Sequence, residues 1–174
     1  MAAVSGFGLA KLFLVDAQWS MQQVGALGIA SGAVTIALGC GAGAWLVRRF
    51  GARRVFLLGV ALAGCGALLW ALMAARLLQL SPPLAFAASA LGSAGAGALS
   101  VALMTAAMRF ASRRQQAGTD MTAVQSTRDL GEIATSSSLI SLAAMLGFEG
   151  SFAVAALLAC LALAVGARAR ALEA

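Results

Sequence analysis

Long apolar runs separated by short polar breaks fill most of this chain. Runs of roughly 20 residues recur, and the breaks between them are brief stretches such as "RRFGARR", "RLLQLSPP" and "GFEG". A helix of about 20 apolar residues is long enough to cross a hydrocarbon core of about 30 Å. The pattern predicts an all-α membrane protein with six transmembrane helices, at about 1–15, 21–47, 55–75, 82–108, 119–148 and 151–167.

The first of these ranges is shorter than the others. At 1.5 Å per residue, residues 1–15 reach only about 22 Å, so we expect a truncated helix there. The range has no basic start and carries Lys11 in its middle, which argues against a cleaved signal peptide.

Composition supports the membrane class and excludes several kinds of site. Hydrophobic residues make up 61% of the 174 residues, charged residues 10%, and the mean hydropathy is +0.94. Soluble domains carry about 25% charged residues, so a soluble helical bundle is the weaker alternative. The chain has no histidine, which excludes Ser-His nucleophile pairs and histidine-containing metal sites. The sequence therefore predicts no enzyme, no cofactor, no metal and no catalytic residue.

The three cysteines fit the same interpretation. Cys40, Cys65 and Cys160 are far apart, and each lies within an apolar run. Neither a disulfide framework nor a metal site is indicated, and we interpret them as small buried hydrophobic residues.

Arginines are distributed unevenly over the polar breaks, and the net charge is +6. Three breaks are rich in arginine, after the second, fourth and last apolar runs, and they hold Arg48, Arg49, Arg53, Arg54, Arg109, Arg113, Arg114, Arg168 and Arg170. Only Arg76 follows the third run. By the positive-inside rule the arginine-rich side and the C-terminus face the cytoplasm. No basic face is interleaved with aromatic residues, so no nucleic-acid partner is expected.

Small residues and tryptophans predict where the helices meet each other and the membrane surface. The second run carries Gly25, Gly28, Gly32, Gly39 and Gly43 on one helical stripe, and the fourth carries Gly92, Gly95 and Gly97. Such stripes let a neighbouring helix approach closely, although membrane helices are also glycine-rich in general. Trp45 and Trp70 lie near the ends of runs and are interpreted as interface anchors.

One polar break resembles a known family signature. The stretch "GAGAWLVRRFGARRVFLLG" resembles the loop signature of the major facilitator superfamily of transporters, a glycine, a short apolar stretch, an acidic-basic pair, a glycine and two basic residues. The residues assigned to it are Gly43, Arg49, Gly51, Arg53 and Arg54. Arg48 occupies the acidic position and Ala44 the first glycine position, with Gly43 beside it.

Two flanking stretches extend the resemblance. "KLFLVDAQWSMQQVGALG" is similar to the muropeptide permease branch, and "AGTDMTAVQSTRDLGE" to the related siderophore permeases. The resemblance implies that the chain is the C-terminal half of a twelve-helix major facilitator fold in the bacterial inner membrane. It also implies a partner, either an N-terminal six-helix half or a second copy of the chain.

Charges within the apolar runs mark the candidate site. In "QSTRDLGEIATSSS" the polar residues Thr122, Gln125, Arg128, Asp129, Glu132 and Ser136 fall on one side of a helix. Burying a charge at the bilayer centre costs about 2.5–3.5 kcal/mol, so such residues are retained where they pair or face water. Lys11 is the other intramembrane cation, and Arg128 can pair with Glu132 four positions later.

Two interpretations of this stripe stay open. The helix is long enough that Arg128 can lie at the cytoplasmic rim and extend to water. Alternatively Lys11, Gln125, Arg128, Asp129 and Glu132 line a solute or proton pathway. The second interpretation predicts a permease that imports a bulky polar solute, such as a ferric siderophore or a muropeptide. The alternatives are a non-transporting membrane interaction protein and an inactive fragment of a split transporter gene.

Overall fold

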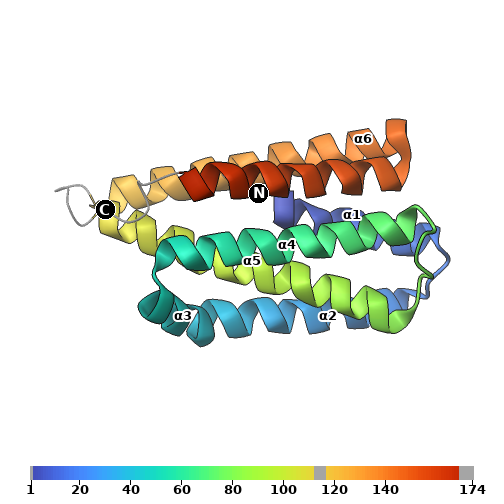
Figure 1. The fold of residues 1–174 in the computed structure, drawn as a ribbon, viewed down its shortest axis with the longest axis horizontal. Coiled ribbons are helices and arrows are strands. Elements are labelled where there is room, and N and C mark those ends of the chain that lie inside the picture. The colour runs from blue at the N-terminus through green and yellow to red at the C-terminus, as the bar shows by residue number, and fades with distance from the viewer. Residues whose placement is uncertain (1, 112–116, 169–174) are drawn as a thin grey trace.

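The computed structural model describes the backbone of residues 2–111 and 117–168, and every regular element in these ranges is helical. In chain order the elements are α1 (Ala2–Asp16), α2 (Met21–Ala37), the π-helical turn η1 (Leu38–Ala42), α3 (Gly43–Phe50), α4 (Ala52–Ala74), α5 (Pro82–Ala111) and α6 (Ala117–Arg168). The helices lie along one long axis (Figure 1). The prediction of an all-helical chain is confirmed for these residues.

The prediction of six transmembrane helices is wrong. Four stretches of the described chain are long and apolar enough to cross a membrane, namely Met21–Phe50, Ala52–Ala74, Pro82–Phe110 and Met121–Gly166. These four stretches indicate a multi-pass membrane protein. The range 1–15 forms α1, but its 15 residues are too few for a span. The six-helix half of a twelve-helix fold, which the family resemblance implied, is corrected accordingly.

The last two predicted helices, 119–148 and 151–167, belong to one element, α6. Its 52 residues contain a single break in helical backbone, at Gly147, where φ is 75° and ψ is 172°. Figure 1 shows α6 doubling back there, so that it has a first arm (117–146) and a second arm (148–168). The sequence predicted a short loop at "GFEG", but a glycine can reverse the chain within one residue because it adopts positive φ without steric cost.

Helix starts follow local chemistry that the sequence shows. The hydroxyl of Ser20 accepts from the backbone N–H of Gln23, and the Gln23 side chain accepts from the Ser20 N–H, which forms a capping box at the start of α2. Helix α5 begins at Pro82, where proline suits the first turn because the first N–H groups of a helix lack partners. These two starts place the connections that precede α2 and α5.

Helix α4 lies at the centre of the bundle and packs against both α5 and α6. Glycines bring α4 and α5 into close contact, since a Cβ at Gly95 would lie 2.6 Å from the Gly59 carbonyl oxygen and 2.6 Å from the Ala63 nitrogen. The predicted close approach at the glycines of α2 is absent at Gly25 and Gly32, because a Cβ added at either glycine would have no neighbouring atom within 4 Å.

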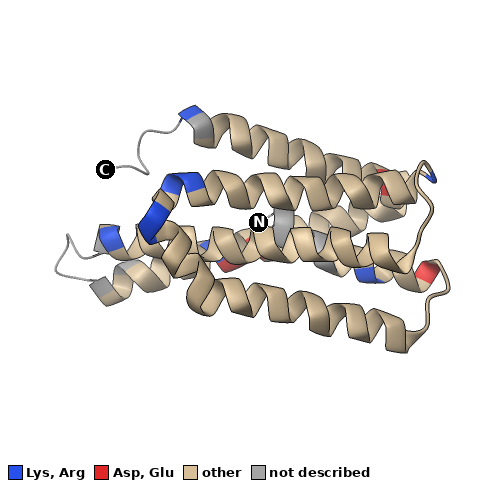
Figure 2. Ribbon diagram, turned by 60° about the horizontal axis from the view of Figure 1, so that its bottom comes forward, with Lys and Arg blue, Asp and Glu red and all other residues tan. Residues whose placement is uncertain are grey.

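Two ends of the bundle differ in character. At the turn end, the α1–α2 connection, the α4–α5 connection and the reversal of α6 surround one pocket. At the other end, here called the arginine end, lie the α3–α4 corner and the ends of α5 and α6 (Figure 1). Figure 2 shows basic residues gathered at the arginine end and few charges between the two ends. The prediction of a cytoplasmic side also included Arg113, Arg114, Arg170 and the C-terminus, which lie outside the described residues.

An apolar cluster near the turn end joins α1, α2, α4, α5 and α6. Trp70 stacks on Phe152 with ring centroids 6.0 Å apart, and Phe13 meets both rings edge-on. Trp70 is only 4% exposed, so its interpretation as an interface anchor is wrong. Trp45, by contrast, is 62% exposed near the arginine end, where a membrane-interface residue is expected.

Candidate functional site

The predicted polar stripe lies on the first arm of α6. Gln125 and Asp129 are exposed, whereas Arg128, Glu132 and Ser136 are half-buried. Helix α6 packs against α4, α1 and α5, and many side chains of its first arm remain exposed. The stripe is therefore a surface feature of the chain by itself.

Arg128 connects the stripe to the neighbouring helix α5. Its Nη2 atom donates a hydrogen bond of 2.8 Å to the hydroxyl of Ser100. No ion pair joins Arg128 to Glu132 in the part of the chain that the structure describes. The spacing of four positions allows that pair but does not require it, because a longer side chain can reach a partner on another helix.

Several hydroxyl groups of the first arm donate to backbone carbonyls of their own helix. Those of Thr127, Thr135 and Ser138 donate to the carbonyl oxygens four residues earlier, at 2.8, 2.6 and 2.8 Å. Asp129 and Glu132, in contrast, have no hydrogen bond or ion pair to any described residue. These two carboxylates are the charged groups of the stripe that still require water or another partner.

An open hollow of about 420 Å³ adjoins the two carboxylates. Its wall is formed by Asp129, Glu132, Ile133, Ser136, Ser137 and Ile140, all on the first arm. One helix thus supplies the whole described wall. A closed channel needs a second wall from elsewhere.

The depth of the stripe follows from helix geometry. Arg54 and Arg76 flank α4, and at 1.5 Å per residue they are about 33 Å apart. Gly147 and Arg76 line the same pocket, so they lie at similar depth. Glu132 precedes Gly147 by about 22 Å of helix, which places it about 10 Å inside the level of the arginine end. The backbone at Glu132 therefore lies between the two ends of the bundle and nearer to the arginine end.

The structure does not bring Lys11 together with the α6 carboxylates. Lys11 is exposed and lies beside α2, where a Cβ at Gly28 would be 3.8 Å from its Nζ atom. Along α1 it precedes Asp16 by about 7.5 Å, whereas Glu132 lies about 22 Å from the same end of the bundle. The axial offset of about 15 Å exceeds the reach of a lysine side chain.

Four residues of the loop signature, Arg49, Gly51, Arg53 and Arg54, lie at the corner between α3 and α4, and the fifth, Gly43, begins α3. Gly51 has φ 83° and ψ 152°, its N–H donates to the Val47 carbonyl at 2.9 Å, and a side chain would be strained in this conformation. Gly43 is buried, since a Cβ there would lie 2.8 Å from a methyl group of Val101. Arg49 and Arg54 are exposed and Arg53 is half-buried.

Two features that bear on function were not predicted from the sequence. Ser100, the partner of Arg128, lies in a run of small residues without a distinguishing pattern. The pocket at the turn end forms from three separate connections, and only the fold brings them together. Within the described residues no group of three or more histidine, cysteine or acidic side chains could hold a metal ion, and the three cysteines are exposed and unbridged.

Comparisons with known proteins add no assignment. No protein-family model matches the chain, and no curated protein or solved structure matches it either.

Proposed function

We propose that this chain is part of a transmembrane transporter in which the α6 stripe lines the pathway of a polar solute. The observation that carries the proposal is the pair of carboxylates, Asp129 and Glu132, which lack partners among the described residues on a membrane-spanning helix. A charge in contact with lipid at the bilayer centre costs about 2.5–3.5 kcal/mol even on a lenient scale, so charges within a span are retained where they pair or face water. The charged side chains of the stripe are more stable in contact with water, enclosed by a second protein wall, than in contact with lipid.

The second wall comes from a partner. The described α6 stripe is open to the surface, so the pathway is complete only with an N-terminal transporter half or with a second copy of this chain. Two glycines on α2, the exposed Gly25 and the half-buried Gly32, offer a further surface that a partner helix can approach closely. The same surface also favours the alternative function, a membrane interaction protein that assembles without transporting.

The class of solute rests on the family resemblance of the sequence. The arginine-rich corner at Arg49–Arg54 and the motifs around Lys11 and Gln125 resemble major facilitator permeases of the muropeptide and siderophore type. We therefore propose a bulky polar solute, such as a ferric siderophore or a muropeptide, with protons as the coupling ion and no enzymatic activity.

The proposed location is the bacterial inner membrane with the arginine end in the cytoplasm. The described arginines other than Arg76 and Arg128 gather at that end, as the positive-inside rule requires of a cytoplasmic face. A reporter active only in the periplasm should stay inactive when fused to the C-terminus. Activity of that fusion would reverse the proposed orientation.

Uptake in the native host tests the transport function. Deletion of the gene should reduce uptake of a radiolabelled ferric hydroxamate or a radiolabelled muropeptide, and the restored gene should recover it. Purified chain in liposomes should give no flux if the partner is a different half, and robust flux if the partner is a second copy. Unchanged uptake of both solutes in the deletion strain would refute this solute class and favour the interaction protein.

A further inference from the structure

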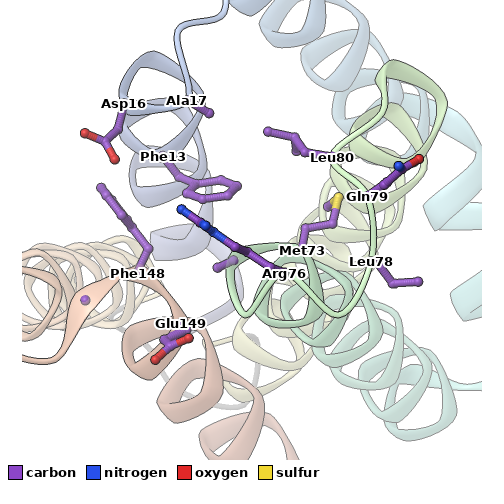
Figure 3. A pocket seen from close by; sticks show the side chains of 12 residues that line it. Phe13, Asp16, Ala17, Met73, Arg76, Leu78, Gln79, Leu80, Phe148 and Glu149 are labelled. Atoms are coloured by element: carbon purple, nitrogen blue, oxygen red, sulfur yellow. The ribbon is translucent and has the colours of Figure 1, made fainter.

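The turn end carries a second polar feature, separate from the α6 stripe. A pocket of about 580 Å³ lies where the α1–α2 connection, the α4–α5 connection and the reversal of α6 meet (Figure 3). This volume falls within the range of about 300–1,000 Å³ that is typical of small-molecule sites. Glu132 lies about 22 Å along the helix from Gly147, which lines the pocket, so the pocket is distinct from the hollow beside the stripe.

Three charged side chains from three different segments line this pocket. Asp16 ends α1, Arg76 follows α4, and Glu149 follows the reversal of α6. Figure 3 shows Arg76 reaching toward Phe13 and Phe148, with the carboxylates of Asp16 and Glu149 on opposite sides of it. In the described structure none of the three charges forms an ion pair, so the guanidinium donors and both carboxylates remain available to a ligand.

The backbone holds Arg76 at this place. Its φ is 58°, its N–H donates to the Met73 carbonyl at 3.1 Å, and the N–H of Leu77 donates to the Leu72 carbonyl at 3.0 Å. This is the Schellman ending of a helix, in which glycine is the favoured residue because the left-handed conformation strains a side chain. An arginine therefore extends into the pocket from a position at which glycine would be easier to accommodate.

We propose that this pocket binds a zwitterionic ligand of the size of an amino acid or a dipeptide. A guanidinium binds a carboxylate through two parallel hydrogen bonds, and Asp16 or Glu149 accepts from the ligand's ammonium group. Phe13 and Phe148 supply apolar walls for its side chains. A simple anion would meet two carboxylates against one guanidinium, and a simple cation would leave the guanidinium without a partner, so opposite charges on one molecule match best.

Binding at the pocket is measured with the full chain purified in detergent, using radiolabelled alanyl-alanine as the probe. Retention should be saturable, and unlabelled alanyl-alanine should compete better than its C-amidated or N-acetylated form. Arg76→Gly should weaken retention at least about tenfold, because it removes a charged bidentate donor. The same change relaxes the helix ending, so the fold should survive it.

The chain offers a matched control at the end of α1. Gln18 has φ 62° in the same kind of helix ending, with its N–H donating to the Val15 carbonyl at 3.0 Å, and it does not line the pocket. Gln18→Gly should leave retention unchanged, because its side chain lies outside the pocket. Equal competition by the amidated dipeptide, wild-type retention by Arg76→Gly, or absence of saturable retention would each overturn the proposal.

Discussion

Solute uptake should be lost when Glu132 is replaced by glutamine, while the amount of protein in the membrane stays unchanged. The substitution removes a carboxylate that has no described partner and faces the hollow on α6. Insertion should survive because an uncharged amide is less costly in the membrane than a charged carboxylate. The measurement is uptake by the native host's deletion strain carrying the variant gene, with membrane protein quantified in parallel.

Thr127→Val is the matched control on the same arm. Thr127 lies on the opposite side of the helix, and its hydroxyl already donates to the Ala123 carbonyl at 2.8 Å. This variant should restore uptake fully. If Glu132→Gln also restores uptake at the wild-type rate at every pH tested, Glu132 is a rim residue and the pathway interpretation fails.

Arg128→Ala should act differently from Glu132→Gln and impair both uptake and insertion. It removes the hydrogen bond to Ser100, and a bond to a charged group contributes about 1.5–3 kcal/mol. It also leaves Asp129 and Glu132 as neighbouring like charges without the cation between them and α5. Normal membrane levels of Arg128→Ala would show that this bond does not position α6.

Replacement of Gly95 by alanine should destabilise the chain more than replacement of any exposed glycine. The added Cβ would meet the Ala63 nitrogen and the Gly59 carbonyl oxygen at 2.6 Å, and backbone atoms cannot move aside as a flexible side chain can. Overpacking of this kind costs about 1–3 kcal/mol, and more where the backbone is involved. The free energy of unfolding in mixed detergent micelles, measured by circular dichroism during a denaturant titration, should fall by that amount.

Gly32→Ala is the control for this experiment. Gly32 lies within α2, and no atom is near enough to contact an added Cβ. Alanine is the better helix former, so stability should stay equal or rise slightly. Equal destabilisation by Gly32→Ala and Gly95→Ala would show that the α4–α5 contact is looser than the structure has it.

The positions of the helices could be predicted from the sequence better than the contacts between them. Polar breaks predicted the start of α2 near Met21 and of α5 at Pro82, because hydropathy and proline act locally. The number of spans was wrong, since α1 has only 15 residues and the two ranges beside "GFEG" belong to one element, α6. In an apolar helix the faces toward lipid and toward protein look alike, which explains why close contacts were predicted at Gly25 and Gly32, which make none, as well as at Gly95, which packs against α4.

In the candidate site, too, the features that depend on one helix could be predicted, and those that depend on the arrangement of helices could not. Period alone placed Arg128, Asp129 and Glu132 on one side of a helix. The bond from Arg128 to Ser100 and the distance of Lys11 from the stripe depend on how the helices are arranged. The pocket around Arg76 depends on the meeting of three connections and could not be inferred from spacing.

Cysteine accessibility on α6 tests the central claim, that the stripe faces water within the membrane. In a chain whose Cys40, Cys65 and Cys160 are replaced by alanine, Ser136→Cys is compared with Leu161→Cys on the second arm. Both positions lie about 16–21 Å of helix from Gly147, but Ser136 borders the hollow and Leu161 is an exposed apolar residue. A charged thiol reagent reacts with thiolate, which forms in water and not in lipid. Native-host membranes should show rapid labelling of Ser136→Cys and little labelling of Leu161→Cys, whereas equally slow labelling of both would contradict a water-filled pathway along α6.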